Sequence, residues 1–293
     1  MLNGIFFRFF FISLFSLVVF KNGLAQDAKI RLVVNYTPNS IYLVTSTTSS
    51  STTVDLLAAD SIKKRHIKLK GAEFPAQLTR WRQTKNRLII GKQEADGTSL
   101  MNVEILDDSI VDKLNGMPFT NESEINLKSK KATLRITASG TLEKVKQIDP
   151  TILPNISKPL SNIFDSYIDT MNFSDTSFSI GDTVIYSIPM RLHLFAANMN
   201  VTIYTVIVLE RVEGERAIFS IASEVKMDVS EKDSSSVASI ISHEEIVYNV
   251  KYFYIEQKKT IDKTSRRLVN SEATVLSDVV EEKTLQIRYI AQE

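Results

Sequence analysis

The chain has 293 residues, with 35 lysines and arginines against 34 aspartates and glutamates, and it contains no cysteine. The absence of cysteine excludes disulfide bonds, thiolate metal sites and cysteine nucleophiles. A net charge of +1 argues against a nucleic-acid partner, because neutralising phosphates needs a basic excess. Three histidines leave little material for a metal cluster.

The N-terminus has the features of a secretory signal peptide. Arg8 precedes an apolar run over residues 9–20, and Gly23 and Ala25 place small residues before a cleavage point after Ala25. This run is shorter than the about 20 residues of a membrane-spanning helix, and it suits a signal-peptide core. We expect residues 1–25 to be removed, with an uncleaved N-terminal anchor as the alternative. The mature chain then has no transmembrane segment and is exported to the periplasm, the cell surface or the medium.

Period-two alternation, the signature of β-strands, recurs through the first half of the mature chain. The polar run at 45–53 reads as an edge strand or a mobile loop, and we favour the strand because threonine suits a pleated surface. Asp96-Gly97 and Ser139-Gly140 each predict a hairpin turn. The expected strands are 30–36, 41–44, 66–70, 77–83, 87–91, 100–106, 133–138 and 141–145.

Two helices are expected among these strands. A short one over 109–115 would have Asp108 or Ser109 as its N-cap and Gly116 just past its end. A longer one over 155–171 carries apolar residues at spacings of three and four, which form one wide stripe. That stripe predicts a helix that packs against a sheet.

The second half again predicts strands, over 183–194, 201–209, 217–229, 246–255, 272–279 and 284–290. Pro189 favours a sheet edge or a bulge in the first of them. The predicted fold is α+β and mostly β, a curved antiparallel sheet or half-open barrel of about a dozen strands. We expect a single domain over 26–293, with a division into 26–118 and 119–293 as the alternative.

The order of these elements is similar to that of a known group of proteins. The hairpin ATLRITASGTLEKVKQI is followed by the long helix and then by Ile180-Gly181-Asp182-Thr183, with LNGMPF before the hairpin. Over residues 105–229 this resembles an uncharacterised family of exported bacterial proteins of unknown function, except that Val184 stands where an aromatic residue is typical. The resemblance implies an envelope location, a β-rich fold and no catalytic residue. In shape alone, the predicted sheet is also similar to the half-barrels of periplasmic lipoprotein carriers.

Three motif fragments lack the partners that their chemistry requires. The HEE sequence at 243–245 lacks the second histidine of the HExxH zinc motif. Ser61 and Lys64 match Ser-x-x-Lys without its companion elements. The carboxylate pairs at 107–108 and 281–282 are adjacent, so on a strand they point to opposite faces. We therefore predict no catalytic, metal-binding or cofactor-binding residue.

Aromatic and methionine residues supply the candidates for ligand contact. The expected strand 246–255 is partly apolar on both faces, so it is either buried core or the wall of a cavity. Trp81 lies between Arg80 and Arg82, where it could pack in the core or stack on a ligand. Methionine adapts to apolar ligands but is also common in cores. The candidate ligand-facing residues are Tyr248, Tyr252, Tyr254, Trp81, Met190 and Met227.

Three functions remain open on the sequence alone. The leading hypothesis is a non-enzymatic envelope protein that binds an apolar or amphipathic ligand, such as a lipid, in a curved β-sheet. The alternative is a structural or interaction module that uses exposed strand edges within a surface or periplasmic assembly. The third is an unrecognised hydrolase whose carboxylates are dispersed along the chain.

Overall fold

A computed structural model describes residues 29–32, 34–58, 74–119, 127–138, 142–148, 176–194, 197–231, 234–270 and 273–291. The expected signal peptide at 1–25, the strand at 66–70, the helix at 155–171 and the Ser61–Lys64 pair lie outside these residues. The described part of the chain consists of strands, turns and loops and contains no helix. Accordingly, none of its segments is a helix with the length and apolar character needed to cross a membrane.

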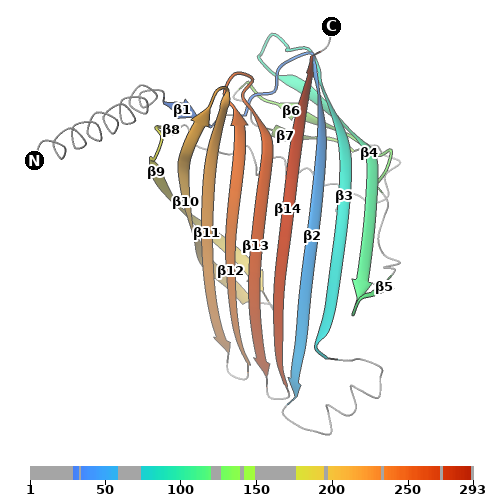
Figure 1. The fold of residues 1–293 in the computed structure, drawn as a ribbon, viewed down its shortest axis with the longest axis vertical. Helices are drawn as coiled ribbons and strands as arrows, with labels where there is room; N and C mark the ends of the chain where they lie inside the picture. Colours follow the sequence, from blue (N-terminus) through green and yellow to red (C-terminus); the bar gives the residue numbers. More distant parts are fainter. Residues whose placement is uncertain are drawn as a thin grey trace, which may run out of the picture.

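One large antiparallel sheet of 12 strands dominates the fold (Figure 1). Its spatial order is β7-β6-β4-β3-β2-β14-β13-β12-β11-β10-β9, and β5 pairs beside β4. The strands are β2 (Ser40–Ala58), β3 (Ala76–Ile90), β4 (Ser99–Leu114), β5 (Met117–Phe119), β6 (Lys131–Ile136), β7 (Leu142–Ile148), β9 (Thr183–Leu194), β10 (Ala197–Glu213), β11 (Arg216–Glu231), β12 (Ser234–Asn249), β13 (Tyr254–Asn270) and β14 (Ala273–Ala291). Two short strands, β1 (Ile30–Arg31) and β8 (Ser177–Phe178), pair with each other.

The first and last long strands of the described chain, β2 and β14, lie side by side in the middle of the sheet. Strands β9 to β14 follow one another as a meander, and β14 then pairs along its whole length with β2. The run at 45–53 lies in the middle of β2, which confirms that it is a strand. It is not an edge strand, because β14 flanks it on one side and β3 on the other. Its hydroxyl-bearing side chains are short, so the strand fits between two neighbours without needing a continuous apolar surface.

Both predicted hairpins and the predicted sheet edge are confirmed. The Asp96-Gly97 turn lies between β3 and β4, which pair antiparallel. The second hairpin is shown by the antiparallel pairing of β6 with β7, while the Ser139-Gly140 turn itself lies outside the described residues. Pro189 lies in β9, which is the last strand at one end of the sheet. The two strands expected at 77–83 and 87–91 are one strand, β3, whose pairing with β4 shifts by a β-bulge between Lys85 and Asn86.

The helix expected at 109–115 is wrong, because β4 runs through this segment to Leu114. Asp108 is not a helix cap. Its carboxylate accepts two hydrogen bonds from Arg82, each of 2.9 Å, and Asp112 is bound in the same way by Arg80. A strand is recognised in a sequence by apolar residues at every second position. Here two of these buried positions hold aspartates, so the pattern is lost. They are tolerated here because each faces an arginine on the neighbouring strand.

The strand expected at 246–255 is also wrong, because the chain turns in the middle of it. Strand β12 ends at Asn249 and β13 begins at Tyr254. The side-chain oxygen of Asn249 accepts hydrogen bonds from the backbone N–H groups of Lys251 and Tyr252, at 3.0 and 2.9 Å. Phe253 then takes a positive φ of 55°. An asparagine that bonds the backbone two residues ahead is a turn-forming device.

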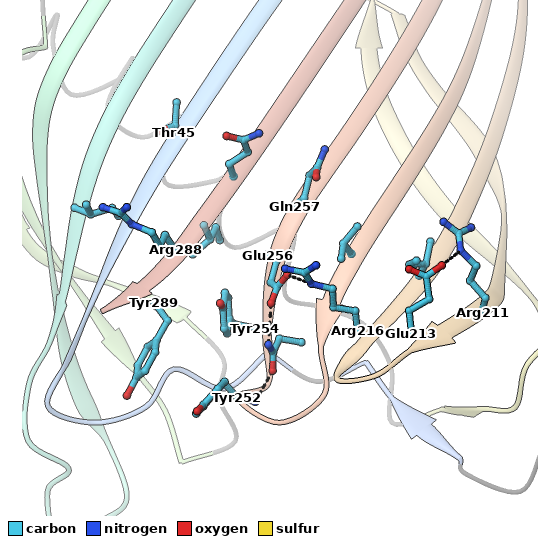
Figure 2. A pocket seen from close by; sticks show the side chains of 16 residues that line it. Thr45, Arg211, Glu213, Arg216, Tyr252, Tyr254, Glu256, Gln257, Arg288 and Tyr289 are labelled. Carbon is cyan, nitrogen blue, oxygen red and sulfur yellow. Dashed lines mark hydrogen bonds and ion pairs between the residues drawn. The ribbon is translucent and has the colours of Figure 1, made fainter. Parts of the chain in front are cut away.

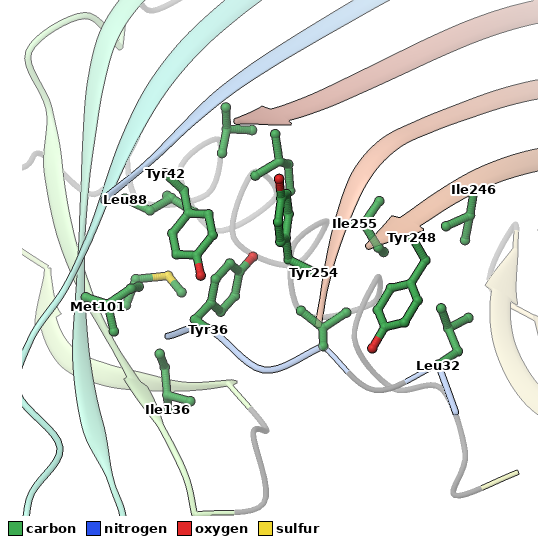
Figure 3. Close-up of a cluster of buried hydrophobic side chains, with 14 of the residues drawn as sticks. Leu32, Tyr36, Tyr42, Leu88, Met101, Ile136, Ile246, Tyr248, Tyr254 and Ile255 are labelled. Atoms are coloured by element: carbon green, nitrogen blue, oxygen red, sulfur yellow. The ribbon is translucent and has the colours of Figure 1, made fainter. Parts of the chain in front are cut away.

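The hydrophobic core lies at one end of the long strands, on one face of the sheet. We call the face that carries Tyr42, Phe219 and Tyr248 the core face, and the opposite one the outer face. These three side chains are fully buried, and Figure 3 shows tyrosines and aliphatic residues gathered between the strands and the segment that carries Leu32 and Tyr36. That segment is tied to the sheet by the Asn35 N–H, which donates to the Phe253 carbonyl at 2.7 Å.

Further along the strands, the core face becomes polar and its charges are paired. Lys258 binds Glu244 at 2.8 Å, and Lys283 lies 3.1 Å from Asp262. By register, these residues and the arginine–aspartate pairs of β3 and β4 belong to the same face as Tyr42. The apolar core therefore gives way to a row of mutually neutralised charges across the middle of the sheet.

Candidate binding groove

A groove of about 890 Å³ crosses the outer face near the core end of the strands. Its floor is one row of residues that are paired with one another in register across six strands, from β2 to β10. Because side chains alternate between the faces of a sheet, paired residues of one row share a face. The row consists of Thr45, Gln286, Gln257, Val247, Ile218 and Arg211.

The groove forms where two neighbouring strands separate. Pairing of β13 with β14 ends at Gln257 and Gln286, although β14 continues to Ala291 along β2 alone. Tyr252, Tyr254 and Tyr289 lie at this opening (Figure 2). The rings of Tyr252 and Tyr289 are stacked, with their centroids 5.2 Å apart and their planes at 20°. This aromatic pair walls the end of the groove.

Charged side chains surround the apolar middle of the floor. Three arginines and two glutamates line the groove. Arg211 binds Glu213 at 2.7 Å, and Arg216 binds Glu256 at 2.6 Å (Figure 2). Glu256 also accepts a hydrogen bond of 2.8 Å from the Asn249 side chain.

Two titratable groups at this end of the sheet have shifted pKa values. Burial, reinforced by the negative charge of Glu256, raises the pKa of the Tyr254 hydroxyl above its usual value. The hydrogen bond and ion pair with Glu215 raise the pKa of Lys251. Its ammonium also lies 5.1 Å from the centre of the Tyr252 ring. At neutral pH Tyr254 is therefore neutral, and the Lys251 ammonium beside Tyr252 is paired with Glu215.

The structure brings two of the six candidate residues to the groove. Tyr252 and Tyr254 line it. Tyr248 is fully buried in the core, and Trp81 is 36% exposed on the outer face of β3, where it pairs with Ser49 and Val111 outside the groove lining. Met190 and Met227 occupy register positions opposite Val201 and Ala238, also outside the lining.

The row of floor residues was missed by sequence reasoning, and so was Arg288. A single sequence gives no register between six strands, so it cannot place Thr45 beside Gln286 or Val247 beside Ile218. One local signal exists: Gln286 and Arg288 alternate with the apolar Ile287 and Tyr289, which assigns the two polar residues to one face.

The described residues contain no candidate metal site. In the ranges that the structure describes, no group of three or more histidine, aspartate or glutamate side chains is placed to hold a metal ion. His243 lies in β12 and pairs with Ala222 and Ile261 on the outer face.

Comparisons with known proteins yield structural likenesses alone. No family model matches the chain, and no curated protein matches it. The chain is similar to a lipovitellin structure reported for its lipid–protein interactions, with a TM-score of 0.46, 9% identity, and coverage of 88% of this chain and 26% of that one. Outer membrane protease OmpT from Escherichia coli gives a TM-score of 0.15 at 8% identity, over 88% of this chain and 99% of that one. The chain thus spans about a quarter of the lipovitellin chain, and likenesses at this level say nothing about what it binds.

Proposed function

We propose that this protein is exported, has no enzymatic activity, and binds an amphipathic ligand in the outer-face groove. The observation that supports this most directly is the composition of the groove lining. Val247 and Ile218 form an apolar centre, while the stacked tyrosines stand at one end and arginines at both. Ligand pockets typically combine apolar and aromatic walls with a few placed polar groups.

The groove also suits ligand binding because of its position in the sheet and the opening beside it. It lies at the end of the sheet that carries the buried hydrophobic core on its opposite face. The opening between β13 and β14 interrupts the backbone pairing of an otherwise continuous sheet. A rigid floor beside such an opening can accept a chain-like ligand without reorganising the fold.

Dansylundecanoic acid is a suitable probe, because it joins an apolar chain to an anionic end and its fluorescence rises when it leaves water. We expect the purified exported protein to bind it saturably. Replacing Tyr252 by alanine removes one wall of the groove and should weaken binding by about tenfold. The mature protein should also begin at Gln26, which mass spectrometry measures directly.

The matched control is Tyr204→Ala, which removes an equally large side chain from the outer face. Tyr204 is 59% exposed and lies outside the groove lining, so this change should leave binding unaltered. Absence of saturable binding contradicts the proposed function, and equal effects of the two substitutions contradict the groove as its location. Hydrolysis of the probe's methyl ester by the protein would contradict the proposal that it is not an enzyme.

A second candidate function is favoured by the ends of the sheet. Among the described strands, β7 and β9 each pair with a single neighbour. Ile185 on β9 is 67% exposed, and an open strand edge can pair with a partner chain. If the protein is such an interaction module, Ile185→Lys should reduce its chemical crosslinking to neighbouring proteins in intact cells. A protein that crosslinks to nothing would contradict this candidate.

A further inference from the structure

One arginine of the groove has no carboxylate of its own. Arg211 and Arg216 are each bound by a glutamate. In the described parts of the chain, Arg288 forms no ion pair and no side-chain hydrogen bond. The lining therefore carries one uncompensated positive charge, since its three arginines exceed its two glutamates by one.

The carboxylate that follows Arg288 along its row of the outer face is Glu104, which is bound to other partners. Arg288 pairs in register with Leu43, and Leu43 pairs with Arg87. Arg87 binds Glu104, which also lies 3.4 Å from Lys131. These two cations, through hydrogen bonds and charge, hold the pKa of Glu104 below its usual value. Glu104 thus stays ionised and bound to its own partners, and it does not neutralise Arg288.

Apolar side chains lie on both sides of Arg288 along the outer face. Leu43 lies beside it, and the floor of the groove leads from β14 over Gln257 to Val247 on β12 and Ile218 on β11. Neighbouring strands are about 4.8 Å apart, so the path from β14 to β11 measures about 14 Å. A flexible apolar chain attached to an anionic head can extend over this distance.

We infer that Arg288 binds the anionic head group, a carboxylate or a phosphate, of an amphipathic ligand whose apolar chain lies over Val247 and Ile218. The inference rests on the proposed function and adds the ligand's charge and orientation. A guanidinium is suited to this role because its planar fork binds carboxylate and phosphate through paired hydrogen bonds. Arg216 is less suited, because its Nε already donates to Glu256.

The test compares dansylundecanoic acid with its methyl ester, which has the same chain and no charge. Binding of both is measured to the native protein and to the variants Arg288→Gln and Arg267→Gln. Arg267 is the matched control, because it is an exposed arginine on the outer face of β13 beyond the groove lining. Inorganic phosphate is added as a competitor that has the head-group charge without the chain.

We expect the native protein to bind the acid about tenfold more tightly than the ester, since a hydrogen bond to a charged group has that magnitude. Arg288→Gln should abolish this preference, whereas Arg267→Gln should preserve it. Binding of acid and ester with equal affinity overturns the inference and leaves the proposed function standing. Failure of the protein to bind either overturns both. If phosphate displaces the acid at equal concentration, the apolar chain contributes no affinity, and this part of the inference is overturned.

Discussion

Tyr42 and Tyr289 are paired in register across β2 and β14, and their ring centroids lie 5.3 Å apart. This contact joins the first long strand to the last one at the core end of the sheet. Tyr42 also packs edge-on against Tyr36 and Tyr254. The tyrosine cluster therefore connects the core to the residues that open the groove.

Replacing Tyr42 by alanine should lower the free energy of unfolding by about 3–5 kcal/mol, because its ring is fully buried and its loss leaves a cavity. Tyr42→Phe keeps the ring but loses the hydroxyl that accepts the Thr37 N–H at 3.0 Å. This milder change should cost about 1 kcal/mol. Urea denaturation measures both values. A loss of stability by Tyr42→Ala no larger than that of the exposed Tyr204→Ala would contradict the packing described here.

The buried Arg82–Asp108 pair should be highly sensitive to loss of charge. The Asp108 side chain is fully buried, and it also accepts a hydrogen bond of 2.9 Å from the Leu127 N–H. Asp108→Asn leaves the arginine uncompensated, which should cost about 3–5 kcal/mol of the free energy of unfolding. Glu215→Gln breaks the exposed pair with Lys251 and should cost far less, because water screens the charges of exposed side chains. Similar denaturation midpoints for the two variants would be inconsistent with this difference in burial.

Two glycines with positive φ offer a matched test of the β3–β4 hairpin. Gly97 has a φ of +81°, and a Cβ there would lie 2.9 Å from the Cβ of Ala138. Gly214 has a φ of +61° and open space around it. Alanine at either position meets the conformational penalty, of roughly 1 kcal/mol. Gly97→Ala should cost about 1 kcal/mol more, because of the steric conflict. Equal losses of thermal stability would show that the hairpin moves aside freely.

The raised pKa of Tyr254 predicts a loss of stability at alkaline pH. An unfolded tyrosine ionises near pH 10 (about 10 in model peptides), while the folded Tyr254 holds its proton to higher pH. Between these two pKa values the unfolded chain binds fewer protons, so the free energy of unfolding falls as the pH rises. Tyr254→Phe cannot ionise and should show a shallower decline above about pH 10. Urea midpoints compared at neutral and alkaline pH measure the difference, and parallel declines would contradict the assignment.

The sequence was informative where the pattern was local. The alternation in β9 and β11, the glycine turns and the edge position of Pro189 all follow from a few neighbouring residues. Thr45 and its neighbours were placed correctly as a strand because threonine fits a pleated surface. The position of that strand at the centre of the sheet depends on β14, far along the chain, and no local pattern contains it.

The errors arose where distant residues satisfy a local anomaly. Asp108 and Asp112 resemble helix-capping or loop residues until Arg82 and Arg80 are placed opposite them on β3. Asn249 resembles an ordinary strand residue until its side chain is seen to hold the following turn. For the same reason Tyr248 and Tyr252, expected on one strand, are separated into the core and the groove.

The central position of β14 also bears on when the fold can be completed. Strands β2 to β7 lie on one side of β14, and β9 to β13 lie on the other. Each group can form local hairpins, but the two groups become one sheet through β14, the last of the described strands along the chain. Closure of such a long loop is slow. The pairing of β14 with β2 is therefore expected to be a late step of folding, after the local hairpins on either side of it have formed.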